Sequence, residues 1–177
     1  MIEVADLYKS FDQNHVLRGV NLKVNDGKSM VIIGASGQGK SVILKCLLGL
    51  TKPNSGKILL NGIDPNSPQK NIIRSKIGML FQGGALFDSL PIWQNVAFRY
   101  LHGKQKINAM EAREIAIKKL ERVGLKKSFA GNFPSELSGG MQKRVALARA
   151  IATQPEIIFF DEPTTGLDPI MAQVINE

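Results

Sequence analysis

Residues 34–41 read Gly-Ala-Ser-Gly-Gln-Gly-Lys-Ser, which is the spacing G-x-x-x-x-G-K-S of a phosphate-binding P-loop. A strand candidate at residues 30–33 leads into this stretch and a helix candidate at residues 42–50 follows it, which is the context that the motif requires. Glycines let successive backbone N–H groups turn toward phosphate oxygens, and a helix N-terminus adds unpaired donors and partial positive charge. Lys40 would reach the β- and γ-phosphates, and the Ser41 hydroxyl would bind Mg²⁺. The predicted site comprises Gly34, Ala35, Ser36, Gly37, Gln38, Gly39, Lys40 and Ser41.

The composition is that of a globular protein. The chain has 177 residues, of which 44% are hydrophobic and 21% are charged. Its apolar runs are shorter than the ~18 residues of a membrane span, and the acidic N-terminus lacks the pattern of a secretory signal. We therefore expect a peripheral subunit if the protein acts at a membrane. The single cysteine, Cys46, lies among leucines, so we expect it to be buried, and a reducing, cytoplasmic location fits.

The net charge is +8 and the sequence pI is about 9.7. Such a balance is compatible with nucleic acid or with anionic lipid headgroups as partners. The basic residues are dispersed in short groups, such as Lys118-Lys119 and Lys126-Lys127, and no stripe is interleaved with aromatics. We interpret most of them as solvated surface, so no nucleic-acid partner is expected, while attraction to a phosphate-rich ligand or a membrane surface stays open.

The hydrophobic pattern predicts an α/β fold with two added parts. Alternation of apolar and polar residues predicts strands of an antiparallel sheet over 2–11 and 16–24, and further strands are expected at 57–61, 76–81 and 157–160. Helical periodicity appears near 91–102, 108–123 and 139–153. We therefore predict one domain over residues 1–177, in which a helical subdomain at about 83–155 is inserted into an α/β core with an N-terminal antiparallel β subdomain.

A second candidate site follows the strand predicted at residues 157–160. Asp161-Glu162 after four apolar residues is a Walker B pattern, and it places the acidic pair at the carboxyl end of the strand, where open α/β sheets bind ligands. Asp161 would support Mg²⁺, and Glu162 would orient or deprotonate an attacking water in phosphoryl transfer. The alternative, an acidic pair that only faces solvent, is disfavoured by the preceding P-loop.

A third candidate site lies at the start of the last predicted helix. Ser138 is a good N-cap, and Gly139 and Gly140 leave backbone N–H groups uncovered at the helix N-terminus, which makes a second anion site. One nucleotide has only one terminal phosphate, so two such helix ends in one chain indicate a composite site completed across a dimer. Within this helix we expect an inward apolar face and an outward basic face that includes Lys143, Arg144 and Arg149.

Five motifs in this order make the chain resemble the nucleotide-binding subunit of an ATP-binding cassette (ABC) transporter. They are the P-loop, Gln82 as the Q-loop residue, the signature at 137–140, Walker B and the D-loop at 166–168. The resemblance implies a P-loop NTPase (RecA-like) core, ATP and Mg²⁺ as ligands, and a head-to-tail homodimer in which each ATP lies between one P-loop and the partner's signature. It also implies that Phe11 stacks on adenine, that Gln82 contacts Mg²⁺ near the permease-docking groove, and that Asp168 signals across the dimer.

Two strings narrow the resemblance. Residues 81–90 (Phe-Gln-Gly-Gly-Ala-Leu-Phe-Asp-Ser-Leu) and 134–145, with Met141 after the signature glycines, are similar to the MlaF-like phospholipid-trafficking ATPases, which serve MCE-protein systems and their chloroplast relatives. That similarity implies lipid transport, an integral membrane permease and an MCE-type substrate-binding protein as partners, and a location at the cytoplasmic face of the inner membrane. Some members carry the label of ribonucleotide transport ATP-binding proteins, a substrate that the sequence does not endorse.

One family feature is missing. The family has a switch histidine downstream of the D-loop, but the two histidines here, His15 and His102, both precede Asp168. We therefore expect a chain that is truncated in its C-terminal core elements, that binds nucleotide weakly and that hydrolyses it poorly. Two alternatives stay open: a soluble ABC ATPase acting in DNA repair or translation, and a non-catalytic remnant. A P-loop kinase would leave the signature and the D-loop unexplained.

Overall fold

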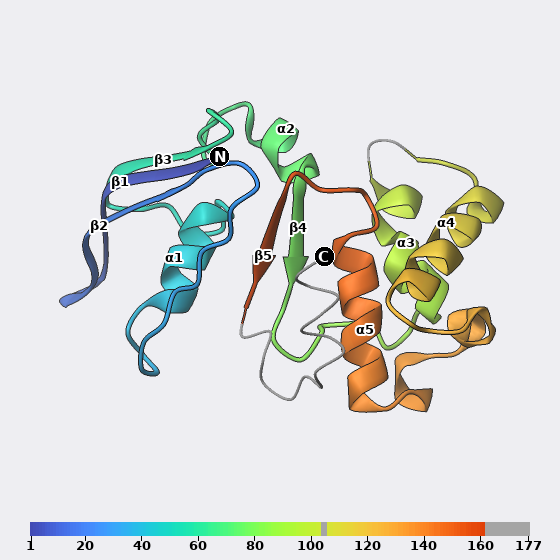
Figure 1. Ribbon diagram of the computed structural model, residues 1–177. Helices are drawn as coiled ribbons and strands as arrows, with labels where there is room; N and C mark the ends of the chain where they lie inside the picture. The colour runs from blue at the N-terminus through green and yellow to red at the C-terminus, as the bar shows by residue number, and fades with distance from the viewer. Residues whose placement is uncertain (104–105, 162–177) are drawn as a thin grey trace. The chain divides into compact units, whose positions relative to one another are not determined.

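The computed structural model describes residues 1–103 and 106–161 of the chain (Figure 1). Two compact units divide it, one of residues 1–75 and one that begins at residue 76. The single domain predicted for residues 1–177 stays a prediction. Glu162 and Asp168 lie outside the described residues.

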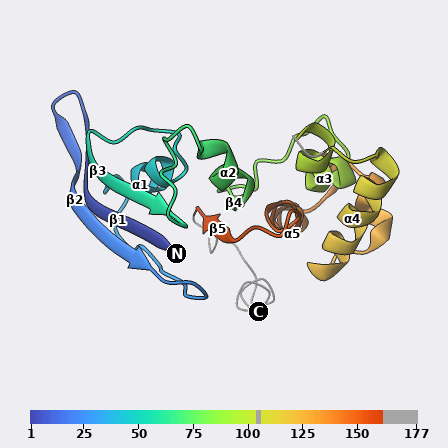
Figure 2. The same ribbon diagram turned by 90° about the horizontal axis from the view of Figure 1, so that it is seen from above.

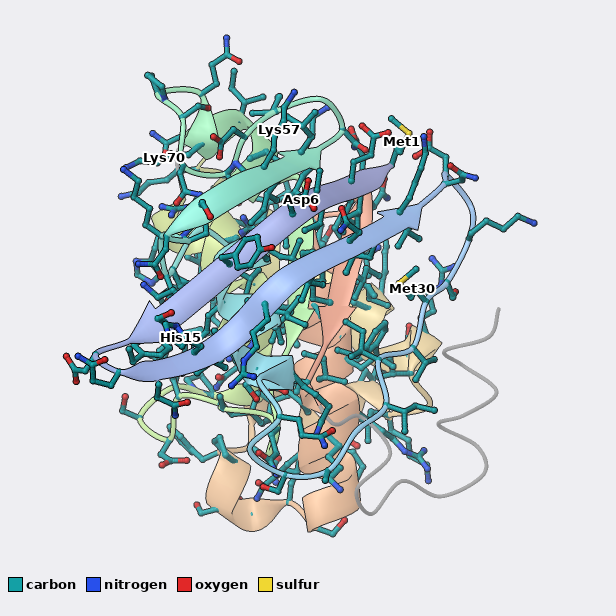
Figure 3. All side chains as sticks on the ribbon, turned by 90° about the vertical axis from the view of Figure 1, so that its left-hand side faces the viewer. Met1, Asp6, His15, Met30, Lys57 and Lys70 are labelled. Atoms are coloured by element: carbon teal, nitrogen blue, oxygen red, sulfur yellow. The ribbon has the colours of Figure 1, made fainter. Side chains whose placement is uncertain are left out.

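A three-stranded antiparallel sheet forms the first unit, as the alternating pattern predicts. Its strands are β1 (Ile2–Phe11), β2 (Asn14–Val24) and β3 (Ser55–Leu60), in the order β2-β1-β3. Figure 3 shows them side by side, with Met1 and His15 toward opposite ends of the sheet. One face supplies the buried residues Val4, Leu7, Leu17, Ile58 and Leu60. The register places Glu3 opposite Lys23, and the pair forms an ion pair of 2.9 Å.

Two helices complete the first unit. Helix α1 (Lys40–Leu47) buries Ile43, Cys46 and Leu47, which confirms that the cysteine is a core residue. Burial raises the pKa of the Cys46 thiol, because the thiolate is penalised away from water. Helix α2 (Lys70–Ser75) was not expected from the sequence; its six residues are too few for a clear helical period, and it buries only Ile73.

The prediction of a strand at residues 30–33 is wrong. These residues adopt no regular secondary structure, and Val31 and Ile33 are 80% and 90% exposed. An apolar run without alternation makes a stable strand only where both of its faces are covered and a neighbouring strand takes up its hydrogen bonds. The sheet of the first unit is completed by β1, β2 and β3, and none of these strands pairs with residues 30–33.

The second unit contains two parallel strands joined through helices. Strands β4 (Ile77–Leu80) and β5 (Ile157–Phe160) pair in register from Ile77 opposite Ile157 to Leu80 opposite Phe160. The N–H of Asp161 donates to the carbonyl of Leu80 at 2.9 Å, which extends the ladder by one residue. Parallel strands require a long crossover, and the predicted helical insertion supplies it.

Three helices form the crossover and a core of their own (Figures 1 and 2). They are α3 (Ile92–His102), α4 (Ala109–Arg122) and α5 (Gly139–Ala150), which confirms the three predicted helical segments, and two short 3₁₀ turns lie at Lys127–Gly131 and Pro134–Glu136. The buried residues they share include Ile92, Val96, Ala112, Ala116, Leu120, Val145 and Ala148. A Cβ on Gly78 of β4 would lie 2.4 Å from the carbonyl oxygen of Ala150, so only glycine lets this strand approach α5.

Candidate nucleotide-binding site

The P-loop of the structure is closed on itself. The Lys40 ammonium donates to the carbonyl oxygens of Gly34 and Ala35 at 2.7 and 2.8 Å. The N–H of Ala35 donates to Oε1 of Gln38 at 3.0 Å. The cation and one backbone donor of the predicted phosphate site are therefore engaged within the loop, and a bound phosphate would have to replace these contacts.

Gly39 joins the loop to the sheet. Its φ of 86° lies in the left-handed region, and it directly precedes α1. A Cβ at this position would lie 2.8 Å from Cγ1 of Val16 and 3.1 Å from Cδ2 of Leu17, both on β2. The fold itself thus requires glycine here, both for the backbone conformation and for the close approach of β2. The start of α1 is fixed in place, as a preformed phosphate site requires.

Phe11 lies at the end of β1, beside the hairpin to β2. Its side chain is 47% exposed, so it is no core residue of the sheet. The Lys9 ammonium lies 4.9 Å from the centre of the ring and donates to the carbonyl of Lys52 at 3.0 Å. The ring is held at the edge of the unit with apolar surface in water, which suits the stacking role predicted for it.

Gln82 and Asp161 come from the same edge of the second unit's sheet. Gln82 follows β4 by two residues and Asp161 follows β5 directly, and carboxyl ends of parallel strands meet at one edge. An amide oxygen and a carboxylate oxygen are ligands that Mg²⁺ accepts, and Mg²⁺ keeps several waters and phosphate oxygens when few protein ligands are present. The donors of this edge therefore fit a magnesium ion bound together with nucleotide. Ser41, the third predicted ligand, lies in the first turn of α1 in the first unit.

The signature lies at the N-terminus of α5. Oγ of Ser138 accepts from the N–H of Met141 at 3.4 Å, which confirms Ser138 as the N-cap. Ser138, Gly139 and Gly140 are exposed, and a Cβ on either glycine would meet nothing within 4 Å among the described residues. The side chain of Gln142 donates to the carbonyls of Pro134 and Leu137, which holds the preceding turn against the helix.

Two polar side chains that support the site escaped the sequence prediction. Asn95 of α3 is fully buried, and its amide bonds both the N–H and the carbonyl of Phe87 and the carbonyl of Leu90. Arg149 of α5 was predicted to face outward, and this is wrong, because its guanidinium bonds the carbonyls of Gly84 and Ala85. The only sequence signal is that Arg149 stands between two alanines of a buried face.

No helix in residues 1–103 and 106–161 is long and apolar enough to cross a membrane.

Comparison with known proteins shows the family of the chain. Residues 17–165 match the ABC transporter family. The chain is 41% identical over 186 residues to the chloroplastic protein TRIGALACTOSYLDIACYLGLYCEROL 3 of Arabidopsis thaliana, covering 100% of this chain and 53% of that protein. It is 42% identical over 176 residues to the glutamate/glutamine/aspartate/asparagine transport ATP-binding protein BztD of Rhodobacter capsulatus, covering 98% and 66%. The chain thus spans about half to two thirds of these relatives.

A solved structure has the same fold. The dimeric, post-hydrolysis state of the ATP-binding cassette MJ0796 bound to ADP and phosphate superimposes with a TM-score of 0.87 at 33% identity, covering 99% of this chain and 79% of that one. The α/β architecture is therefore that of a P-loop NTPase cassette, with the antiparallel strands and the helical insertion where the sequence predicts them. This chain belongs to the ABC transporter family, in its ATP-binding cassette.

Proposed function

We propose that this chain is the ATP-binding and ATP-hydrolysing subunit of a membrane ABC transporter, and that it works as a head-to-tail dimer. The observation that carries the proposal is the pair Gly139-Gly140. Glycine in a helix costs about 0.5–1 kcal/mol relative to alanine. Neither residue has the left-handed φ that would require glycine, and a Cβ at either would have open space. What these glycines offer is close access for something outside the chain's own fold, and a phosphate at a helix N-terminus fits that access.

The residues divide the chemistry between two surfaces. On one, the N–H groups of the P-loop, Lys40 and Ser41 hold the phosphates, while Phe11 holds the base. On the other, Ser138 and the N–H groups of Gly139 and Gly140 approach the γ-phosphate of the ATP held by the second copy. Each nucleotide is thereby enclosed by two chains. The dimeric state described for the similar cassette MJ0796 supports a dimer for this chain.

Water activation is assigned to the carboxyl end of the core sheet. Gln82 and Asp161 would hold the metal ion, and Glu162 accepts the proton of the attacking water. Bound Mg²⁺ would supply neutralisation of the charge that develops on the transferred phosphoryl group. Asp168 links this centre to the second copy across the dimer.

For the transported substrate we propose phospholipid. The support is the resemblance of residues 81–90 and 134–145 to lipid-trafficking ATPases, together with the chloroplastic relative whose name is that of a galactolipid. The partners are then an integral permease that docks near Gln82 and an MCE-type protein, at the cytoplasmic face of the inner membrane. BztD, named for amino acid transport, matches at the same level of identity and gives the competing substrate class. Normal outer-membrane lipid asymmetry in a strain lacking the gene would refute the lipid assignment.

Complementation between two inactive variants tests the dimer and the hydrolysis together. Lys40→Met removes the P-loop cation, and Gly140→Ala blocks the signature. Each variant alone should lose about nine tenths or more of its MgATP hydrolysis. In a 1:1 mixture half of the dimers are mixed, and each mixed dimer keeps one site with an intact P-loop and an intact signature, so about a quarter of wild-type turnover should return.

Glu162→Gln is the control for this assignment. Added to the Gly140→Ala chain, whose P-loop holds the ATP of the intact site, it should abolish the recovered turnover, whereas added to the Lys40→Met chain it should leave that turnover unchanged. A mixture that stays as inactive as its components would contradict a site shared between chains. Full activity of either single variant would contradict the residue roles proposed here.

A further inference from the structure

Arg149 clamps the segment that follows Gln82. It lies in the last turn of α5, and its two terminal nitrogens donate to consecutive backbone carbonyls, Nη2 to Gly84 at 2.7 Å and Nη1 to Ala85 at 2.8 Å. The planar guanidinium is suited to such a forked contact, which fixes orientation as well as distance. A lysine could bond only as a point charge.

The clamped backbone has an unfavourable conformation. Gly83, Gly84 and Ala85 have φ values of 71°, 81° and 45°, so three successive residues are left-handed. For alanine this conformation costs about 1–2 kcal/mol. The segment also lies directly on the helix, since a Cβ on Gly84 would stand 3.3 Å from Cβ of Ala146. Strained backbone persists only where its surroundings hold it, and Arg149 is the side chain that holds this one.

The guanidinium of Arg149 binds the backbone carbonyls of the loop instead of a carboxylate among the described residues. The side chain is half-buried, and burial lowers the pKa of its guanidinium. Among the described residues no carboxylate lies within ion-pair distance of it. The guanidinium also lies 5.9 Å from the ring centre of Phe87. A buried charge without hydrogen-bond partners is strongly disfavoured, so the two carbonyls of the loop and the arginine stabilise each other.

Asn95 anchors the continuation of the same segment to another helix. Its side chain, in α3, bonds the backbone of Phe87 and Leu90. The stretch after Gln82 is thus attached twice, to α5 through Arg149 and to α3 through Asn95. Only the first attachment reaches the helix whose opposite end carries Gly139 and Gly140.

We infer that Arg149 is a positioning residue that couples the Gln82 loop to the signature end of α5, an inference that rests on the proposed function. An α-helix rises 1.5 Å per residue and bends little, so the ten residues from Gly139 to Arg149 transmit a displacement over about 15 Å. Movement of the loop on nucleotide binding or permease docking then moves the signature that serves the other chain's ATP.

Hydrogen exchange on the full-length protein tests the clamp without relying on activity. The Arg149→Met variant should raise the exchange rate of residues 82–90 about 10-fold and also change exchange at residues 137–142, while residues 109–122 of α4 keep the wild-type rate. Arg149→Lys should restore part of the protection. Arg113→Met, at an exposed arginine of α4, is the matched control and should change none of these segments.

Kinetics then separates coupling from simple support. Because Arg149 is no part of the P-loop, Arg149→Met should keep the Kd for ATP within about 2-fold, while kcat and its stimulation by the permease fall about 10- to 100-fold. Unchanged exchange at residues 82–90 would overturn the clamp. Raised exchange there with no change at residues 137–142 and unaltered kcat would overturn the coupling. If the wild-type protein does not hydrolyse ATP, the proposed function fails, and exchange at the two segments still decides whether the clamp and its coupling exist.

Discussion

The two helices that are predicted to bind phosphate, α1 and α5, begin in different ways. At the start of α1, Gly39 is required by the fold, because its φ is left-handed and β2 leaves no room for a Cβ. At the start of α5, Ser138 caps the helix, and the glycines at 139 and 140 meet neither requirement. A glycine in a binding motif can therefore be required by the fold, as Gly39 is, or be free of any such requirement, as Gly139 and Gly140 are. Only at a glycine of the latter kind can a substitution change function without lowering stability.

The largest effect should come from Gly39→Ala. Left-handed strain of about 1–2 kcal/mol adds to overpacking of about 1–3 kcal/mol against Val16, so the unfolding free energy should fall by about 2–5 kcal/mol and ATP binding should be lost. Gly37→Ala is the matched control, because its φ is 80° but a Cβ there meets nothing within 4 Å. Denaturant unfolding of both variants measures the difference, and equal losses would show that contact with β2 contributes nothing.

At the other helix the same change should separate stability from activity. Gly140→Ala should raise the unfolding free energy by about 0.5–1 kcal/mol, because alanine favours a helix, and should lower the kcat of ATP hydrolysis about 10- to 100-fold. Gly131→Ala, at a glycine that also has open space and no left-handed φ, should leave kcat unchanged. Thermal melts and turnover assays together check the prediction, and retained turnover in Gly140→Ala would remove the case for a ligand at this end.

A smaller effect concerns the buried face of α1. Burial raises the pKa of the Cys46 thiol above its ordinary value, with the charge of Lys9 acting in the opposite direction. The unfolded chain then loses this proton before the folded chain does, so stability declines as pH rises above about 9. The slope cannot exceed about 1.4 kcal/mol per pH unit for one group.

Cys46→Ala isolates this contribution, because the difference between the two proteins cancels the other groups that titrate at alkaline pH. Urea unfolding of both proteins from pH 8 to pH 11 should show the gap between them narrowing as pH rises. A gap that stays constant would mean that the thiol has the same pKa in both states.

The smallest expected effect lies in the closed P-loop. Gln38→Ala frees the N–H of Ala35 for phosphate, and since a neutral hydrogen bond contributes about 0.5–1 kcal/mol net, ATP should bind about 2- to 5-fold more tightly. Gln69→Ala, an exposed glutamine of the same unit, should leave affinity unchanged. Isothermal titration with MgATP provides the measurement, and weaker binding in Gln38→Ala would indicate that the side chain contacts the nucleotide instead.

The amino-acid sequence was sufficient to predict those features whose physical cause lies within a few residues of the chain. Alternation predicted β1 and β2, helical periodicity predicted α3, α4 and α5, and Ser138 was predicted as an N-cap before its hydrogen bond was seen. The same holds for the motifs, since glycine conformation and helix ends act within a few residues. The order of the motifs also predicted the family that the comparisons show.

Tertiary structure decided what depends on distant neighbours. The apolar run at 30–33 has the composition of a buried strand, yet a strand forms only where a partner backbone and cover on both faces exist, and the first unit provides neither. The helical pattern predicts that the charged side chain of Arg149 faces solvent. In the structure its guanidinium instead donates to the carbonyls of Gly84 and Ala85, two residues with left-handed backbone. The Arg149 contacts join residues that are 64 and 65 positions apart in the chain, and whether residues 30–33 have a partner strand is likewise not contained in any local pattern.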